Sequence, residues 1–154
     1  MALALAGCSS AKAEPAPRQA PGWGVQTSAA PASRAPFDYR AVLAEIRRKG
    51  FTADEPATVP PGPLRAFLAV GTGSADGGYQ QVFFFDEGRL AGTTHGGRYE
   101  ILGQDGTSVR LELPQYAGSD AQCCPSAPSR RHTATLTGTT LTITPPIPAD
   151  PNHQ

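Results

Sequence analysis

The sequence predicts an α+β domain in which one N-terminal helix packs on a mostly antiparallel, curved meander sheet of about six to seven strands. A single segment near residue 40 has helical spacing of apolar residues and suitable caps at both ends. Beyond residue 63 the chain alternates short strand-like runs with turns. The 154 residues include 17 Gly and 16 Pro, a composition that suits one loop-rich domain with unfolded flanks.

The helix is predicted over Phe37–Lys49. Asp38 is a suitable N-cap because its carboxylate can accept hydrogen bonds from the free amides of the first turn. Apolar residues then recur at helical spacing, namely Val42, Leu43 and Ile46. Gly50 suits the left-handed residue that follows a helix, and Phe51 can fold back on Ile46. Both ends of the helix are therefore specified by local residues.

The strands follow in a series of short runs. They are predicted over Leu64–Gly71, Tyr79–Asp86, Arg89–Thr94, Tyr99–Gly103, Thr107–Leu113, Thr133–Thr137 and Thr140–Thr144. The short connections Asp86-Glu87-Gly88, Gln104-Asp105-Gly106 and Gly138-Thr139 are hairpin signals. Because Val82-Phe83-Phe84-Phe85 is apolar at every position, we expect both faces of that strand to be covered.

Composition divides the chain into four parts. Residues 1–7 are interpreted as the remnant of a signal peptide, and residues 8–36 as a lipidated cysteine with a Pro/Ala-rich tether. Residues 37–145 form the single predicted domain. Residues 146–154 are rich in proline and are expected to be a disordered tail.

The N-terminal segment Leu5-Ala6-Gly7-Cys8 resembles the bacterial lipobox. In such signals the Cys8 thiol would receive a diacylglycerol, and palmitate is a typical acyl chain. Small residues before the cysteine let a peptidase reach the bond, and two acyl chains give a stable anchor. No basic residue precedes the short apolar run, so we expect the full signal to begin upstream or to have been trimmed. Without acylation of Cys8 the protein would be secreted.

The charge balance limits the classes of partner. The chain has 13 Lys and Arg against 13 Asp and Glu. A neutral chain lacks the basic face that binds nucleic acid, and it is not attracted to anionic lipid. Membrane attachment is therefore expected to be covalent, through Cys8.

No catalytic constellation is predicted, and the sequence indicates neither an enzyme nor a cofactor. His95 lies in a turn and is interpreted as an exposed loop histidine. Ser126 and His132 could be a nucleophile and its base, but no orienting acid or nucleophile-elbow motif accompanies them. The glycine-rich segment Gly71–Gly78 lacks the lysine of a phosphate loop and is interpreted as a flexible connection.

Cys123 and Cys124 are adjacent, and outside the cytoplasm such thiols tend to be oxidised. A disulfide between neighbours could clamp a tight turn, serve as a redox or ligand-sensing switch, or, when reduced, bind a soft metal. Pairing between molecules and a reduced pair are further alternatives. Metal binding has little support, because neither His95 nor His132 has zinc-ligand spacing to the cysteines. No metal site is therefore predicted.

Several segments resemble the LppP/LprE-type lipoproteins of actinobacteria. These are the strand Tyr79–Phe85, the segment Tyr116…Asp120…Cys123-Cys124-Pro125-Ser126, and the lipobox ahead of a Pro/Ala linker. The ratio of 11 Arg to 2 Lys fits a GC-rich genome of that kind. The resemblance implies a lipoprotein on the outer face of the cytoplasmic membrane, anchored by Cys8, with no established activity.

Two classes of function follow from these observations. One is a non-catalytic, monomeric envelope module that binds a protein, a glycan or a lipid, or that has a structural role in a larger assembly. The other is a redox or soft-metal protein that acts through Cys123 and Cys124.

Overall fold

The computed structural model describes residues 36–56 and 60–152. Cys8, the signal remnant and nearly all of the tether lie outside these residues. The described part of the chain contains one helix and eight strands, in the order α1 (Tyr39–Arg48), β1 (Phe51–Thr52), β2 (Leu64–Gly71), β3 (Gln80–Asp86), β4 (Arg89–Thr93), β5 (Glu100–Gln104), β6 (Ser108–Gln115), β7 (Ala127–Thr137) and β8 (Thr140–Thr144).

The helix α1 has the predicted caps. The Asp38 carboxylate accepts a hydrogen bond of 3.0 Å from the amide of Ala41. Gly50 follows the helix with a φ of +83°, a conformation that glycine adopts without a steric penalty. Among the described residues, no helix has both the length and the apolar character needed to cross a membrane.

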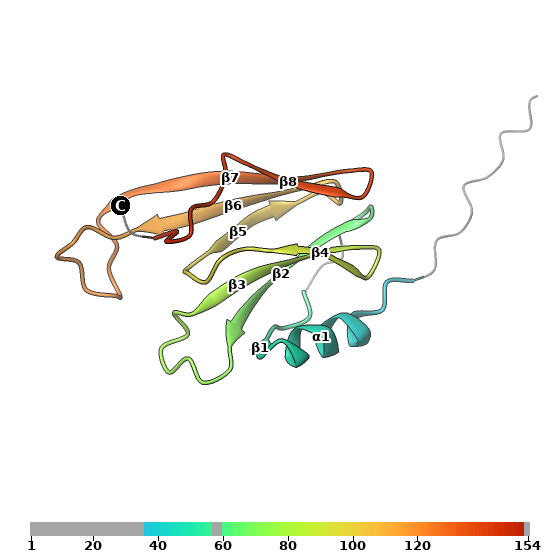
Figure 1. The fold of residues 1–154 in the computed structure, drawn as a ribbon, viewed down its shortest axis with the longest axis horizontal. Coiled ribbons are helices and arrows are strands. Elements are labelled where there is room, and N and C mark those ends of the chain that lie inside the picture. Colours follow the sequence, from blue (N-terminus) through green and yellow to red (C-terminus); the bar gives the residue numbers. More distant parts are fainter. Residues whose placement is uncertain (1–35, 57–59, 153–154) are drawn as a thin grey trace, which may run out of the picture. The chain divides into compact units, whose positions relative to one another are not determined.

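The strands form two antiparallel sheets, which corrects the single curved sheet that the sequence predicts. The first sheet has the order β1-β2-β3-β4 and the second has the order β5-β6-β7-β8 (Figure 1). Every hydrogen-bonded neighbour is also a neighbour in sequence, so the chain forms two successive meanders. The expectation of mostly antiparallel strands with one helix is confirmed.

The division into two sheets arises where the chain leaves β4. Instead of starting a fifth strand, Thr94 turns its hydroxyl toward β3 and accepts a 2.9 Å hydrogen bond from the amide of Val82. Gln80 and Gly97 then exchange two backbone hydrogen bonds of 2.9 Å each. The loop thereby satisfies backbone groups at one end of β3, and the following strand can pair elsewhere.

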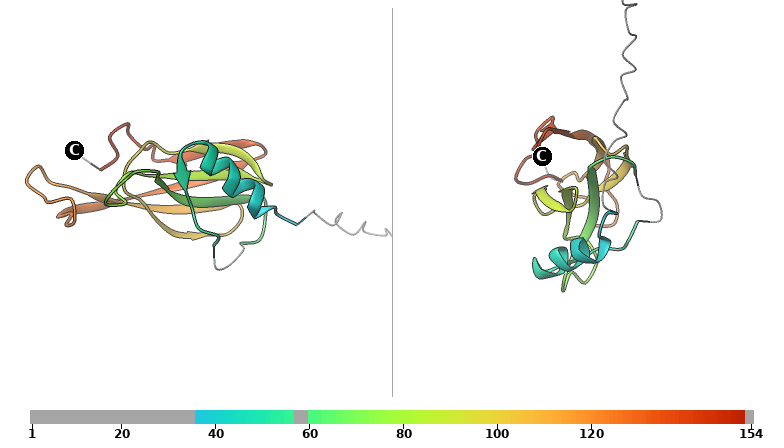
Figure 2. Two further views of the ribbon diagram at one scale, coloured as in Figure 1. Left: turned by 90° about the horizontal axis from the view of Figure 1, so that it is seen from below. Right: turned by 90° about the vertical axis from the view of Figure 1, so that its right-hand side faces the viewer.

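Three layers result: α1, the first sheet and the second sheet (Figures 1 and 2). Phe83 and Phe85 of β3 are buried against Val42 and Ile46 of the helix. On the other face of the first sheet, residues such as Phe84 belong to the cluster between the two sheets. The prediction that both faces of this strand are covered is therefore confirmed. Alternating side chains of one strand enter two separate cores.

The hairpin between β3 and β4 shows how the predicted turns form. Asp86 pairs with Arg89, so Glu87 and Gly88 are the two turn residues. Their φ angles are +50° and +94°, as a two-residue turn matched to strand twist requires. Between β5 and β6, the Asp105 carboxylate accepts hydrogen bonds from the amides of Thr107 and Ser108.

Strand β7 extends six residues further toward the N-terminus than predicted, because it begins at Ala127 rather than Thr133. This part contains Pro128 and two arginines and is largely exposed, so it has no alternating apolar pattern. It pairs with β6 beside a register shift between Leu113 and Gln115. Pro114, which cannot donate a ladder hydrogen bond, lies at this irregularity.

The C-terminal segment differs from the disordered tail expected over residues 146–154. Asn152 is buried, and its backbone oxygen accepts a 2.9 Å hydrogen bond from the amide of Tyr116. The Gln115 side chain donates to the carbonyl oxygen of Pro151 at 2.8 Å. These bonds hold residues that follow β8 against the end of β6, although their proline-rich sequence has no pattern that predicts order.

Candidate functional site

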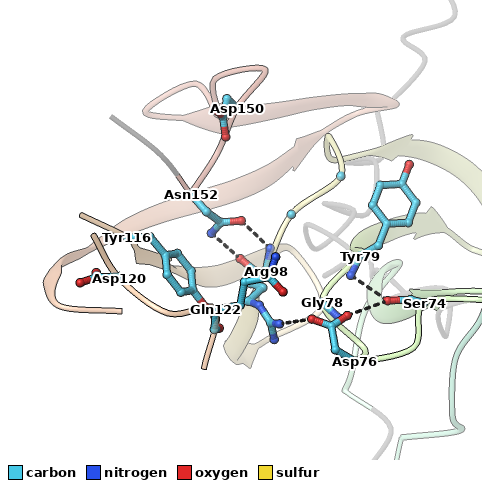
Figure 3. A pocket seen from close by; sticks show the side chains of 12 residues that line it. Ser74, Asp76, Gly78, Tyr79, Arg98, Tyr116, Asp120, Gln122, Asp150 and Asn152 are labelled. Carbon is cyan, nitrogen blue, oxygen red and sulfur yellow. Dashed lines mark hydrogen bonds and ion pairs between the residues drawn. The ribbon is translucent and has the colours of Figure 1, made fainter. Parts of the chain in front are cut away.

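A pocket of about 420 Å³ lies where four loop segments meet (Figure 3). It is formed by the β2–β3 loop, the β4–β5 loop, the β6–β7 loop and the C-terminal segment. Its volume falls within the range of small-molecule sites. The residues that line it are Ser74, Asp76, Gly78, Tyr79, Gly96, Gly97, Arg98, Tyr116, Asp120, Gln122, Asp150 and Asn152.

An ion pair crosses one wall of the pocket. Arg98 donates to Asp76 at 2.7 Å, and the same carboxylate accepts a 2.9 Å hydrogen bond from the amide of Gly78. The Gly78 amide is the main cause that lowers the pKa of Asp76, and Arg98 adds to the effect. A Cβ at Gly78 would lie 2.6 Å from the Arg98 guanidinium, so a larger residue there would displace the guanidinium from its present position.

The glycine-rich segment before β3 is an ordered loop and not the flexible connection expected from its composition. The Ser74 hydroxyl accepts a 3.1 Å hydrogen bond from the amide of Tyr79, and it lies 3.4 Å from the Asp76 carboxylate. The Ser74 amide donates in turn to the carbonyl oxygen of Gly71 at 3.0 Å. Short polar side chains that bind nearby backbone groups stabilise turns of this kind.

Asn152 joins this wall to the second sheet. Its side-chain oxygen accepts from the Arg98 amide at 2.6 Å, and its side-chain nitrogen donates to the carbonyl oxygens of Arg98 and Pro114 at 3.0 and 2.8 Å. The buried Asn152 side chain is thus hydrogen-bonded to both the amide and the carbonyl oxygen of Arg98, and it positions the backbone that carries the Arg98 side chain. The sequence could not single out Asn152, because this role depends on contacts 38 and 54 residues away.

Asp120 holds the opposite wall, which belongs to the β6–β7 loop. Its carboxylate accepts hydrogen bonds from the amides of Ala117 and Ser126 at 2.7 and 2.8 Å, and from the Ser126 hydroxyl. The Ser126 hydroxyl and amide, followed by the Ala117 amide, lower the pKa of Asp120. The Tyr116 hydroxyl donates to the carbonyl oxygen of Gln122 at 2.9 Å. Asp120 and Ser126, which carry part of the family resemblance, therefore close this loop.

Cys123 and Cys124 lie in the same loop and are joined by a disulfide. Both residues are exposed, and neither lines the pocket. The Cys124 amide donates to the carbonyl oxygen of Ala121 at 2.9 Å. A disulfide between neighbours closes essentially no length of chain, so it removes little entropy from the unfolded state. Asp120 already holds the ends of the loop without it.

The histidines lie apart from this site. His95 is exposed in the β4–β5 loop, as expected. His132 is buried, with Nδ1 2.6 Å from the carbonyl oxygen of Pro145, whereas the Ser126 hydroxyl is bound to Asp120. The structure therefore does not pair Ser126 with His132. Within residues 36–56 and 60–152, no cluster of three or more His, Cys, Asp and Glu side chains could hold a metal ion.

Comparison with known proteins identifies a family. A family model described as LppP/LprE lipoprotein matches residues 58–138, slightly more than half of the chain. These residues run from the segment before β2 to the end of β7 and include the disulfide loop. No curated protein and no solved structure matches the chain.

Proposed function

The chain belongs to the LppP/LprE lipoprotein family, and we propose that it is an envelope protein whose folded part is a non-catalytic binding module. The proposal includes a diacylglyceryl anchor on Cys8, on the outer face of an actinobacterial cytoplasmic membrane. The lipobox-like segment supports this anchor, and the neutral net charge removes electrostatic adhesion as an alternative. The folded part would then act as a monomer in the envelope.

The observation that carries the binding role is a pocket whose walls are held by hydrogen bonds while some of its polar side chains have no partner among the described residues. Ion-pair and amide contacts fix Arg98, and Asp120 fixes the opposite loop. Among the described residues, none is hydrogen-bonded to the side chains of Gln122 and Asp150. Pre-organised walls with free polar groups favour ligand binding.

The same geometry supports a non-catalytic role. Asp76 and Asp120 are both engaged in several hydrogen bonds, and the pKa of each is lowered. A general acid or base works best when its pKa lies near the working pH. At neutral pH these two carboxylates are therefore ionised and are poor general acids as well as weak bases, and we assign them to the shape of the pocket.

The test is photo-crosslinking in living cells. Benzoylphenylalanine placed at the exposed Ala121, which precedes the pocket residue Gln122 and leaves its side chain intact, should give adducts to an envelope component (Figure 3). The same probe at Thr142, an exposed residue of β8, is the matched control and should give none of these adducts. Identical adduct patterns at the two positions, or no adduct at Ala121, would contradict a binding role for the pocket.

A redox role for Cys123 and Cys124 is the second candidate. It is favoured by an exposed disulfide in a loop that Asp120 already closes. An envelope dithiol would supply two electrons and two protons, so that the Cys123–Cys124 bond breaks and the dithiol becomes a disulfide. A soft metal bound to the reduced pair would have these two thiols as ligands. The described residues contain no cluster of three or more His, Cys, Asp and Glu side chains that would supply a third ligand.

The redox candidate predicts that Cys123→Ser/Cys124→Ser melts within about 1 °C of the wild type, because little chain entropy depends on the bond. Asp120→Ala is the comparison, since it should speed hydrogen exchange of the Ala117 and Ser126 amides. Cys124→Ser alone should trap a mixed disulfide through Cys123. A large drop in the melting temperature of the double variant would instead show a structural clamp, and absence of a trapped partner would exclude the redox role.

A further inference from the structure

The most exposed large apolar side chain among the described residues belongs to the pocket. Tyr79 is 54% exposed, compared with 37% for Leu102 on β5. Tyr79 lies at one end of the pocket, and Tyr116 and Gln122 lie at the other end (Figure 3). An exposed aromatic residue at one end of a pocket, with polar side chains at the other end that have no partner among the described residues, is the composition of a site that binds a ligand with both apolar and polar parts.

Contacts hold the Tyr79 ring in place although it is exposed. A Cβ at Gly71 would overlap the Cδ1 side of the ring, and a Cβ at Gly96 would overlap its Cε2 side, so both glycines lie close against it. The ring of Phe51 is stacked on Tyr79, with centroids 5.6 Å apart and an interplanar angle of 29°. A ring fixed in this way loses little conformational entropy when a ligand stacks on it.

Charge limits the chemistry of the ligand. Among the described residues that line the pocket, three are carboxylates, Asp76, Asp120 and Asp150, and one is a guanidinium, Arg98. An anionic ligand such as a phosphate or a uronic acid would therefore meet net repulsion. A cation would find mainly Asp150, because Arg98 is paired with Asp76 and three donor groups are hydrogen-bonded to Asp120.

We propose that this pocket binds a neutral saccharide, with one sugar face on the ring of Tyr79. The C–H groups on such a face are apolar and weakly positive, which suits the negative face of an aromatic ring. Sugar hydroxyls both donate and accept, and they match the amide of Gln122 and the carboxylate of Asp150. The inference rests on the binding role proposed above and adds the ligand class.

The test uses the full chain in detergent and an array of neutral oligosaccharides built from glucose, galactose, mannose, arabinose and N-acetylglucosamine. Trigalacturonate and spermidine are the anionic and cationic comparisons. We expect at least one neutral oligosaccharide to bind and both comparisons to fail. In NMR, saturation should transfer from the protein to protons on one face of the sugar.

Variants locate the binding. Tyr79→Ala should weaken the affinity for the selected oligosaccharide by about tenfold or more, whereas Tyr79→Phe should retain it because the ring remains. Gln122→Ala should weaken it without touching the stacked ring. Leu102→Ala, the matched exposed apolar control on β5, should bind as the wild type does.

The outcomes separate the ligand class from the binding role. If no neutral oligosaccharide binds while the crosslink at Ala121 persists, the saccharide inference is wrong and the binding role stands. Spermidine binding that depends on Tyr79 would point to a cationic ligand and overturn the inference. Saccharide binding that Tyr79→Ala leaves unchanged would place the ligand elsewhere. Loss of both the saccharide and the crosslink would contradict both proposals.

Discussion

Gly106→Ala is expected to lower the free energy of unfolding by about 3–5 kcal/mol. Gly106 has a φ of +90°, which L side chains rarely adopt. An added Cβ would overlap the carbonyl oxygen of Pro61, and Gly62 is also in close contact. Because these are backbone atoms, no rotation of a side chain relieves the clash. The backbone would have to move to relieve the overlap. This movement would also disturb the 2.8 Å hydrogen bond from the Leu64 amide to the Gly106 oxygen, which connects the β5–β6 turn to the start of β2.

Two matched glycines separate the causes of this destabilisation. Gly138 has a φ of +60°, but an added Cβ would meet open space, so Gly138→Ala should cost about 1 kcal/mol from backbone strain alone. Gly118 has open space and no positive φ, so Gly118→Ala should be close to neutral. Urea unfolding followed by circular dichroism measures all three. Equal values for Gly106→Ala and Gly138→Ala would show that the contact with Pro61 contributes nothing.

Cys8→Ser is expected to move the protein from the membrane fraction to the soluble fraction. Each buried methylene of an acyl chain contributes about 0.8 kcal/mol to membrane binding, so losing two chains removes the whole anchor. The neutral chain has no electrostatic attraction to replace it. Fractionation of cells followed by mass spectrometry of the N-terminal peptide measures both location and acylation.

The control for the anchor is Cys123→Ser/Cys124→Ser, which removes the other two cysteines of the chain and should stay in the membrane fraction. Retention of Cys8→Ser in the membrane would contradict a lipid anchor at this residue. Release of both variants would show that thiol loss in general, rather than acylation of Cys8, changes the location.

Local sequence was sufficient to predict those elements whose conformation depends on residues close together in the chain. Asp38 and Gly50 cap the helix as predicted, because capping depends on neighbours within four residues. The turn at Glu87 and Gly88 follows from residues that tolerate positive φ. The apolar run of β3 correctly indicated two covered faces.

Local sequence was insufficient where a residue acts over a long distance. The separation into two sheets depends on the Thr94 hydroxyl reaching Val82 and on the pairing of Gln80 with Gly97. The first part of β7 is polar and contains a proline, so only its pairing with β6 makes it a strand. The periodicity of apolar residues in the sequence does not predict such long-range contacts.

The sequence by itself determined the helix, the hairpins, the apolar β3 strand and the resemblance to a lipoprotein family, because each depends on residues close together in the chain. Only the tertiary structure decided that Tyr79, Arg98, Gln122 and Asn152 surround one pocket. It also showed that Asp120, rather than the disulfide alone, closes the loop beside it. The physical reason is that a pocket is made by loops from separate strands, and their meeting depends on how the two sheets pack.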